Sequence, residues 1–194
     1  MKKVFFLFLF MTSLSGCLIA QASEWQKYEP NEIHPYGMRD PQAPASLDDF
    51  APMIGTCDCK SQSRNPDGTW QDSVDMIWTF KYIMNGTAIQ DEVWRENSYA
   101  TSIRLFNPDS AVWVVSYHSN PSVSMRTPTW IGKKADKDIV LYMDQMAPNG
   151  MEGSSRLTFT DISFDGFHWR GEWVNEEQGI VYPFWLIWCK KRKI

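Results

Sequence analysis

Three charged residues lie within segments that alternate between apolar and polar side chains, and they are the main candidates for chemistry. Alternation places Asp91 and Arg104 on otherwise apolar strand faces. Arg156 alternates with Leu157 and can face either side of its strand. Ionic groups enclosed in this way either orient the carboxylate or amide of a ligand, or form a salt bridge that plugs the interior.

Aromatic residues form the second candidate set, since the chain contains 10 Trp, 7 Tyr and 11 Phe. Such side chains line a pocket or fill a core. Combining them with the charged residues, we predict that a ligand contacts Trp78, Asp91, Arg104, Trp113, Tyr117, Arg156 and Trp169.

Other catalytic patterns are missing from the sequence. There is no recognisable Ser-His-Asp or Cys-His signature, phosphate loop or metal-ligand spacing. The histidines are His34, His118 and His168, and none has the neighbours that a haem or metal ligand normally has. We expect no cofactor and no metal.

The main expectation is a non-enzymatic barrel that binds a small hydrophobic or amphipathic molecule. The alternatives are an enzyme of the same fold, an isomerase or hydrolase that uses the Asp/Arg cluster, and a structural lipoprotein with a filled barrel.

The elements that must position these residues are β-strands. Residues 70–82 alternate with period two, which is typical of a half-buried antiparallel strand. Asn85-Gly86 predicts a two-residue hairpin turn, and residues 107–110 predict a four-residue turn. Residues 46–49 predict a capping box for one short helix. We therefore expect an all-β fold, an up-and-down antiparallel β-barrel of about eight to ten strands. The predicted strands are 55–63, 70–82, 87–96, 101–106, 111–118, 127–132, 139–145, 154–162, 167–174 and 180–190.

Six short motifs occur in order along residues 47–192. They are 50–56 (FAPMIGT), 65–70 (NPDGTW), 85–91 (NGTAIQD), 102–106 (SIRLF), 156–159 (RLTF) and 167–169 (FHW). Together they resemble bacterial lipocalin-like proteins of unknown function in the calycin superfamily. The resemblance implies a barrel of eight to ten strands with one interior cavity, and it implies no particular function. Lipocalins usually have Gly-x-Trp in the first strand, whereas this chain has Gly55-Thr56-Cys57.

Three cysteines lie in the expected barrel. Cys57 and Cys59 are two residues apart, so on a strand they share one face. If the first and last strands are neighbours, one of them can reach Cys189. We predict a disulfide of Cys189 with Cys57 or Cys59, which would close a loop of about 130 residues and stabilise the fold by roughly 3–5 kcal/mol. A three-cysteine metal site is the alternative, but no His or carboxylate completes a known spacing.

The first 22 residues have the pattern of an export signal, with two lysines before an apolar run that is too short to span a bilayer. Either Cys17 is acylated, as in a bacterial lipobox, or cleavage follows Ala22. We expect an outer-membrane lipoprotein held by a lipid anchor, or a periplasmic or secreted protein. Residues 23–45 are an expected extended linker, and residues 46–194 the lipocalin-like barrel.

Removing the two signal lysines from the 19 basic residues leaves 17 basic against 23 acidic residues, a net charge of −6. This acidic balance argues against nucleic acid as a partner.

Overall fold

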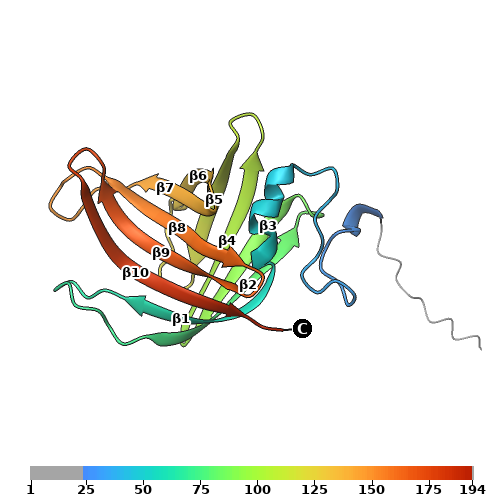
Figure 1. Cartoon of the computed structure of the whole chain (residues 1–194), viewed down its shortest axis with the longest axis horizontal. Coiled ribbons are helices and arrows are strands. Elements are labelled where there is room, and N and C mark those ends of the chain that lie inside the picture. Colours follow the sequence, from blue (N-terminus) through green and yellow to red (C-terminus); the bar gives the residue numbers. More distant parts are fainter. Residues whose placement is uncertain (1–23, 194) are drawn as a thin grey trace, which may run out of the picture.

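The structure is a computed structural model that describes residues 24–193; the expected export signal and Cys17 lie outside the described residues. It contains two 3₁₀ helices and ten strands (Figure 1). The helices are η1 (Glu24–Gln26) and η2 (Ala45–Met53). The strands are β1 (Gly55–Ser63), β2 (Val74–Ile83), β3 (Ala88–Arg95), β4 (Ser98–Asn107), β5 (Val112–Ser119), β6 (Thr129–Ala135), β7 (Asp138–Asp144), β8 (Ser154–Ser163), β9 (Gly166–Asn175) and β10 (Ile180–Lys191).

The strands form one closed barrel in which each strand pairs antiparallel with its neighbours in sequence. The first and last strands also pair antiparallel, and this seam closes the sheet. The predicted all-β, up-and-down barrel is therefore confirmed, with ten strands. The second strand was predicted to start at Trp70, but Trp70 forms only an isolated bridge with Arg64, and the continuous strand starts at Val74.

Two turns decide which residues of β3, β4 and β5 face inward. The β2–β3 turn has four residues rather than two, and Met84, Asn85 and Gly86 have positive φ angles. Ile83 pairs with Ala88, and a two-residue turn would give the same register. The residues of β3 that were predicted to face inward therefore do so. In the β4–β5 hairpin Phe106 pairs with Trp113. That register differs by two residues from the predicted one, and a shift of two keeps every side chain on its face.

One end of the barrel is closed by η2. Leu47, Phe50 and Met53 from this helix are fully buried against the barrel core. The Nε1–H of Trp113 on β5 donates to Asp49 Oδ2 over 3.1 Å, which fixes the helix to the barrel wall. The predicted capping box is wrong: the helix starts after Pro44 and has no side-chain cap, because it is a 3₁₀ helix rather than an α-helix.

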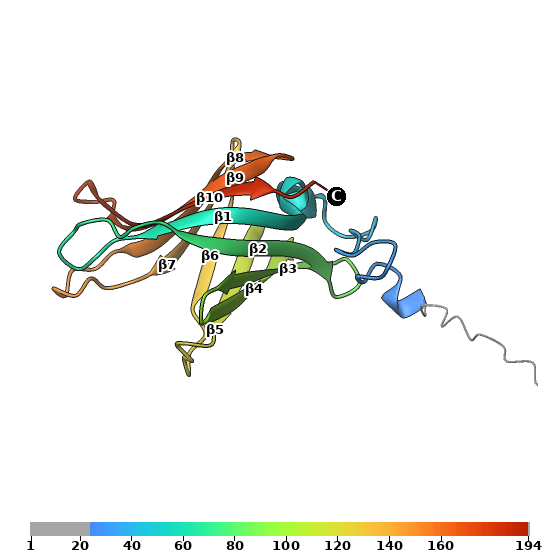
Figure 2. The same ribbon diagram turned by 90° about the horizontal axis from the view of Figure 1, so that it is seen from below.

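An N-terminal arm of residues 27–44 lies at the same end (Figures 1 and 2). Its backbone bonds to the β2–β3 turn, where Asp40 N–H donates to Gly86 O over 3.0 Å and Tyr28 N–H donates to Asn85 Oδ1 over 2.9 Å. Residues expected to be a linker therefore pack on the barrel. Within residues 24–193, no helix has the length and apolar character needed to cross a membrane.

Candidate functional site

A cavity of about 340 Å³ lies inside the barrel, at the end opposite η2. We refer to it as the barrel cavity. Its walls come from nine strands, β2 to β10, that turn alternate residues inward, so small and aromatic side chains from distant parts of the chain meet there. Its lining includes Met76, Trp78, Asp91, Val93, Arg95, Ser98, Ala100, Ser102, Arg104, Val115, Tyr117, Trp130, Leu141, Met143, Gln145, Ser155, Leu157, Phe159, Trp169, Phe184, Trp185 and Ile187.

An ion pair forms the floor of the barrel cavity. The Arg104 guanidinium donates from Nη1 to Asp91 Oδ2, and both residues are almost completely buried. The Cζ atom of Arg104 lies 5.2, 5.1 and 5.7 Å from the ring centroids of Phe50, Phe80 and Phe159, which is within cation–π range. The aromatic rings therefore pack around the guanidinium at the floor of the cavity.

Two hydrogen-bond donors of the cavity lining lack a partner among the described protein atoms. They are Nε of Arg104 and Nε1 of Trp78, and both are buried. A buried polar group without a partner costs about 1–3 kcal/mol. The unsatisfied Nε therefore distinguishes the Asp91–Arg104 pair from a fully hydrogen-bonded structural salt bridge.

Arg95 lies at the mouth of the barrel cavity. Its Cζ atom is 5.1 Å from the ring centroid of Trp185, and its Nη2 lies 3.4 Å from Ser98 Oγ. Trp185 belongs to β10, which is separated from β3 by β2 and β1 in the sheet. Arg95 therefore reaches across the barrel rather than along one wall. No carboxylate of the described residues forms an ion pair with it.

The predicted ligand-contacting residues divide into three groups in the structure. Trp78, Asp91, Arg104, Tyr117 and Trp169 line the barrel cavity. Trp113 is inside the barrel but lies beneath the cavity, where it packs edge-on against Phe50 with ring centroids 4.9 Å apart.

Arg156 is on the outer face of β8, because its neighbours Ser155 and Leu157 turn inward. The expected cluster of Asp91, Arg104 and Arg156 is therefore wrong. On the outer surface Arg156 pairs with Glu172.

Several cavity residues were missed by the sequence reasoning. Arg95 and Ser102 follow from the same alternation, because Arg95 is four residues after Asp91 and Ser102 is two residues before Arg104. Phe184 enters the cavity because β10 shifts register between Pro183 and Trp185. Such a bulge places two consecutive residues on one face, and alternation alone does not predict it.

The seam between β1 and β10 contains the disulfide. Cys59 and Cys189 pair directly across the two strands and are bonded, which confirms the prediction with Cys59 as the partner. Cys57 stays reduced and has no exposed surface. Burial raises the pKa of its thiol to about 11, so it is an unreactive neutral group near neutral pH. Within residues 24–193 there is no group of three residues that could hold a metal ion.

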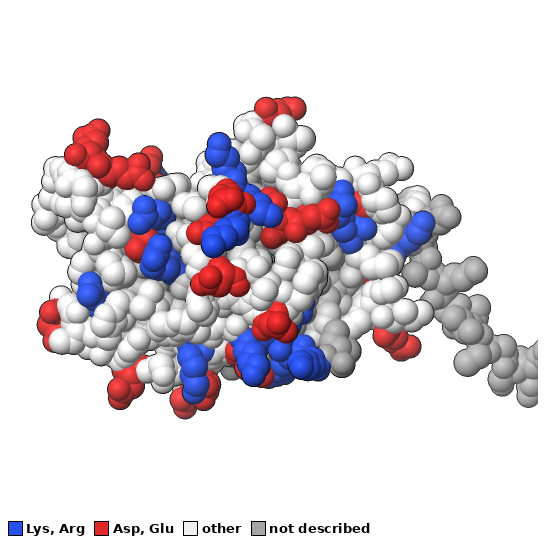
Figure 3. All heavy atoms as spheres, in the orientation of Figure 1, with Lys and Arg blue, Asp and Glu red and all other residues white. Residues whose placement is uncertain are grey.

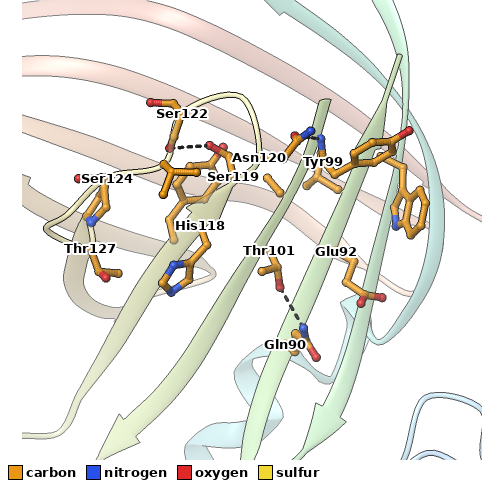
Figure 4. Close-up of a pocket in the computed structure, with 16 residues that line it drawn as sticks. Gln90, Glu92, Tyr99, Thr101, His118, Ser119, Asn120, Ser122, Ser124 and Thr127 are labelled. Atoms are coloured by element: carbon orange, nitrogen blue, oxygen red, sulfur yellow. Dashed lines mark hydrogen bonds between the residues drawn. The ribbon is translucent and has the colours of Figure 1, made fainter. Parts of the chain in front are cut away.

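A second hollow, the outer groove, lies between the outer faces of β3–β5 and the β5–β6 loop (Figure 4). It measures about 640 Å³ and is larger than the barrel cavity. Two of its polar side chains already have partners: Gln90 Nε2 donates to Thr101 Oγ1 over 3.0 Å, and Glu92 pairs with Lys81 over 3.2 Å. The barrel cavity, whose apolar and aromatic walls enclose a few polar side chains, is the better candidate for a small-molecule site.

No family model matches this chain, and no curated protein matches it in sequence. Among solved structures, the chain is similar to the S-type phycobiliprotein lyase CPES from Guillardia theta. The two share 12% sequence identity over 77% of this chain and 94% of that chain, with a TM-score of 0.48. A likeness of this degree says nothing about the ligand or activity of this protein. The chain is, by its own structure, a closed antiparallel barrel with an interior cavity.

Proposed function

We propose that this protein is a non-enzymatic binding protein that holds one small amphipathic molecule inside its barrel. The observation that supports this most directly is the barrel cavity, which combines aromatic walls with a few polar side chains, among them the Asp91–Arg104 pair on its floor. Apolar walls with a few placed polar groups are typical of small-molecule sites. If each ligand atom needs about the 30 Å³ that a water molecule occupies in the liquid, the cavity holds roughly eleven non-hydrogen atoms.

The two alternatives fit the same cavity less well. A barrel filled by its own side chains would leave no space of about 340 Å³. An enzyme that uses Asp91 as a base would need that carboxylate free, whereas Arg104 donates to it directly.

The test is to isolate the full protein from its native envelope and measure its mass under native conditions, then identify what solvent extraction releases. The matched pair of variants is Ala100→Trp, which fills the barrel cavity, and Ala135→Trp, which adds the same ring at the exposed end of β6. We expect wild type and Ala135→Trp to retain one small molecule and Ala100→Trp to lose it, with similar circular dichroism. Equal retention by both variants would place the ligand elsewhere, and a clean apo mass in wild type would contradict the proposal.

We also propose that residues 1–22 direct export and that Cys17 is acylated. The basic, apolar and Leu-Ser-Gly-Cys segments in that order support this. Mass spectrometry of the mature N-terminal peptide tests it. An acylated Cys17 is expected, and an unmodified Ser23 terminus would instead indicate a soluble exported protein.

A further inference from the structure

The barrel cavity has an uneven charge distribution. Its ionised side chains are Asp91, Arg104 and Arg95. The first two offset each other on the floor. Arg95 is left as an uncompensated positive charge at the mouth, whereas the chain as a whole has a net charge of −4. The outer face shown in Figure 3 mixes acidic and basic side chains, so the single cation at the mouth is a local feature of the cavity.

The geometry of Arg95 leaves it able to bind an anion. Its guanidinium lies against the ring of Trp185, and one nitrogen is near Ser98 Oγ. A guanidinium has five N–H donors in a planar fork, so most of them remain free for a carboxylate or phosphate oxygen. Stacking on an indole restricts the side chain, which reduces the entropy lost when an anion binds.

The floor sets a different requirement for the other end of the ligand. Because Asp91 already neutralises Arg104, the floor carries no net charge and suits an uncharged part of the ligand. A second anion there would lie close to the Asp91 carboxylate and be repelled. The two ends of the cavity therefore differ in the group that each can accept.

We propose that the ligand is an anionic amphiphile, with its oxyanion head at Arg95 in the mouth and its apolar body against the aromatic walls. This rests on the proposed function, because it names the ligand class of the same cavity. A carboxylate and a phosphate monoester share the required head-group chemistry.

The experiment measures calorimetric binding of four ten-carbon probes to the full mature protein: decanoate, monodecyl phosphate, decanol and decyltrimethylammonium. We expect at least one anion to bind about tenfold more tightly than decanol, about 1.4 kcal/mol, because its head group accepts charge-assisted hydrogen bonds from Arg95. The better anion identifies which oxyanion the mouth prefers.

Variants separate the role of Arg95 from general effects. Arg95→Gln is expected to lower the affinity for the anion about tenfold and to leave that for decanol unchanged. Arg156→Gln removes an arginine from the outer face and is the control, with no change for any probe. Equal binding of anions and decanol by wild type would overturn this inference while leaving a binding barrel in place. Failure of all four probes to bind, together with a clean apo mass, would overturn both proposals.

Discussion

Two of the arginine–carboxylate pairs in the molecule join strand residues and differ in their surroundings. Arg104 and Asp91 lie inside the barrel, where their side chains are 3% and 2% exposed. Arg156 and Glu172 lie outside, at 21% and 4%. The inner guanidinium donates once to its carboxylate and keeps an unsatisfied Nε. The outer guanidinium donates from Nε and Nη2 to Glu172 Oε2 over 3.0 and 2.8 Å, and Arg170 Nε forms an ion pair with the other oxygen at 3.1 Å.

This difference separates a structural ion pair from a candidate binding group. The outer cluster joins directly paired positions of β8 and β9, Arg156 opposite Glu172, and places an arginine nitrogen near each carboxylate oxygen. The inner pair lies among aromatic rings and leaves hydrogen-bonding capacity unused at the floor of the cavity. Burial alone does not distinguish them, because Glu172 is nearly as enclosed as Asp91.

The largest expected effect is that of breaking the inner pair. Arg104→Met would leave the Asp91 carboxylate buried without a partner, which costs about 3–5 kcal/mol of unfolding free energy. Urea denaturation at pH 7 measures the loss. The double variant Asp91→Leu with Arg104→Met should recover most of it, because both charges are then removed. An equal loss in Arg156→Met would abolish the distinction between the two pairs.

Cys57 provides a second test of how the interior treats a charge without a partner. Its thiol pKa is raised from an ordinary value of 9.0 to about 11 because burial disfavours the thiolate. The folded state therefore keeps the proton when the unfolded state has lost it, and stability falls as pH rises from about 9 to 11. Two pKa units correspond to roughly 2–3 kcal/mol at the upper end. Urea unfolding at pH 8 and pH 10.5 measures this, and the Cys57→Ala variant should lose less stability between the two.

The outer pair is expected to cost less when broken. Glu172→Gln removes the charge but keeps a side chain that can still accept hydrogen bonds, while Arg156 and Arg170 are exposed enough to reach water. The expected loss is about 1–2 kcal/mol. Urea denaturation at low and at 0.5 M salt checks it. A loss as large as that of Arg104→Met would show that Glu172 behaves as a fully buried charge.

The smallest effect is expected at Arg170, whose side chain is 46% exposed. Arg170→Gln should change the unfolding free energy by no more than about 0.5 kcal/mol, because exposed ion pairs contribute little. The same denaturation assay applies. A loss above that of Glu172→Gln would mean that Arg170, rather than Arg156, is the main partner of the outer carboxylate.

The positions of the inner residues were predictable wherever a short turn fixed the register. The β2–β3 turn assigned Asp91 to the inner face, and the β4–β5 turn assigned Arg104 to it. The first turn is longer than predicted and the second pairing is shifted by two residues. Neither difference moved a side chain to the other face, because side-chain direction repeats every two residues. Arg156 was not predictable, because it follows a connection of residues 145–153 whose length sets no register.

The cavity mouth was not predictable either. Arg95 contacts a ring that lies ninety positions later in the chain, Trp185, and that ring is placed by the register shift after Pro183. A proline has no N–H to donate to the ladder between two strands, and this accounts for the irregular pairing next to Pro183. The contact itself is tertiary and leaves no local pattern in the sequence.

The disulfide at the β1–β10 seam has a further consequence for the connectivity of the chain. Each pair of neighbouring strands is connected along the chain by a turn or loop, except β1 and β10. These two strands are connected by the disulfide between Cys59 and Cys189. Residues 59–189 therefore form a covalent ring. A protease that cuts once in an exposed loop of this ring, such as residues 145–153, would leave a single molecule until a reductant is added. Circular permutation with new ends in the same loop would likewise keep every strand tied to its neighbours.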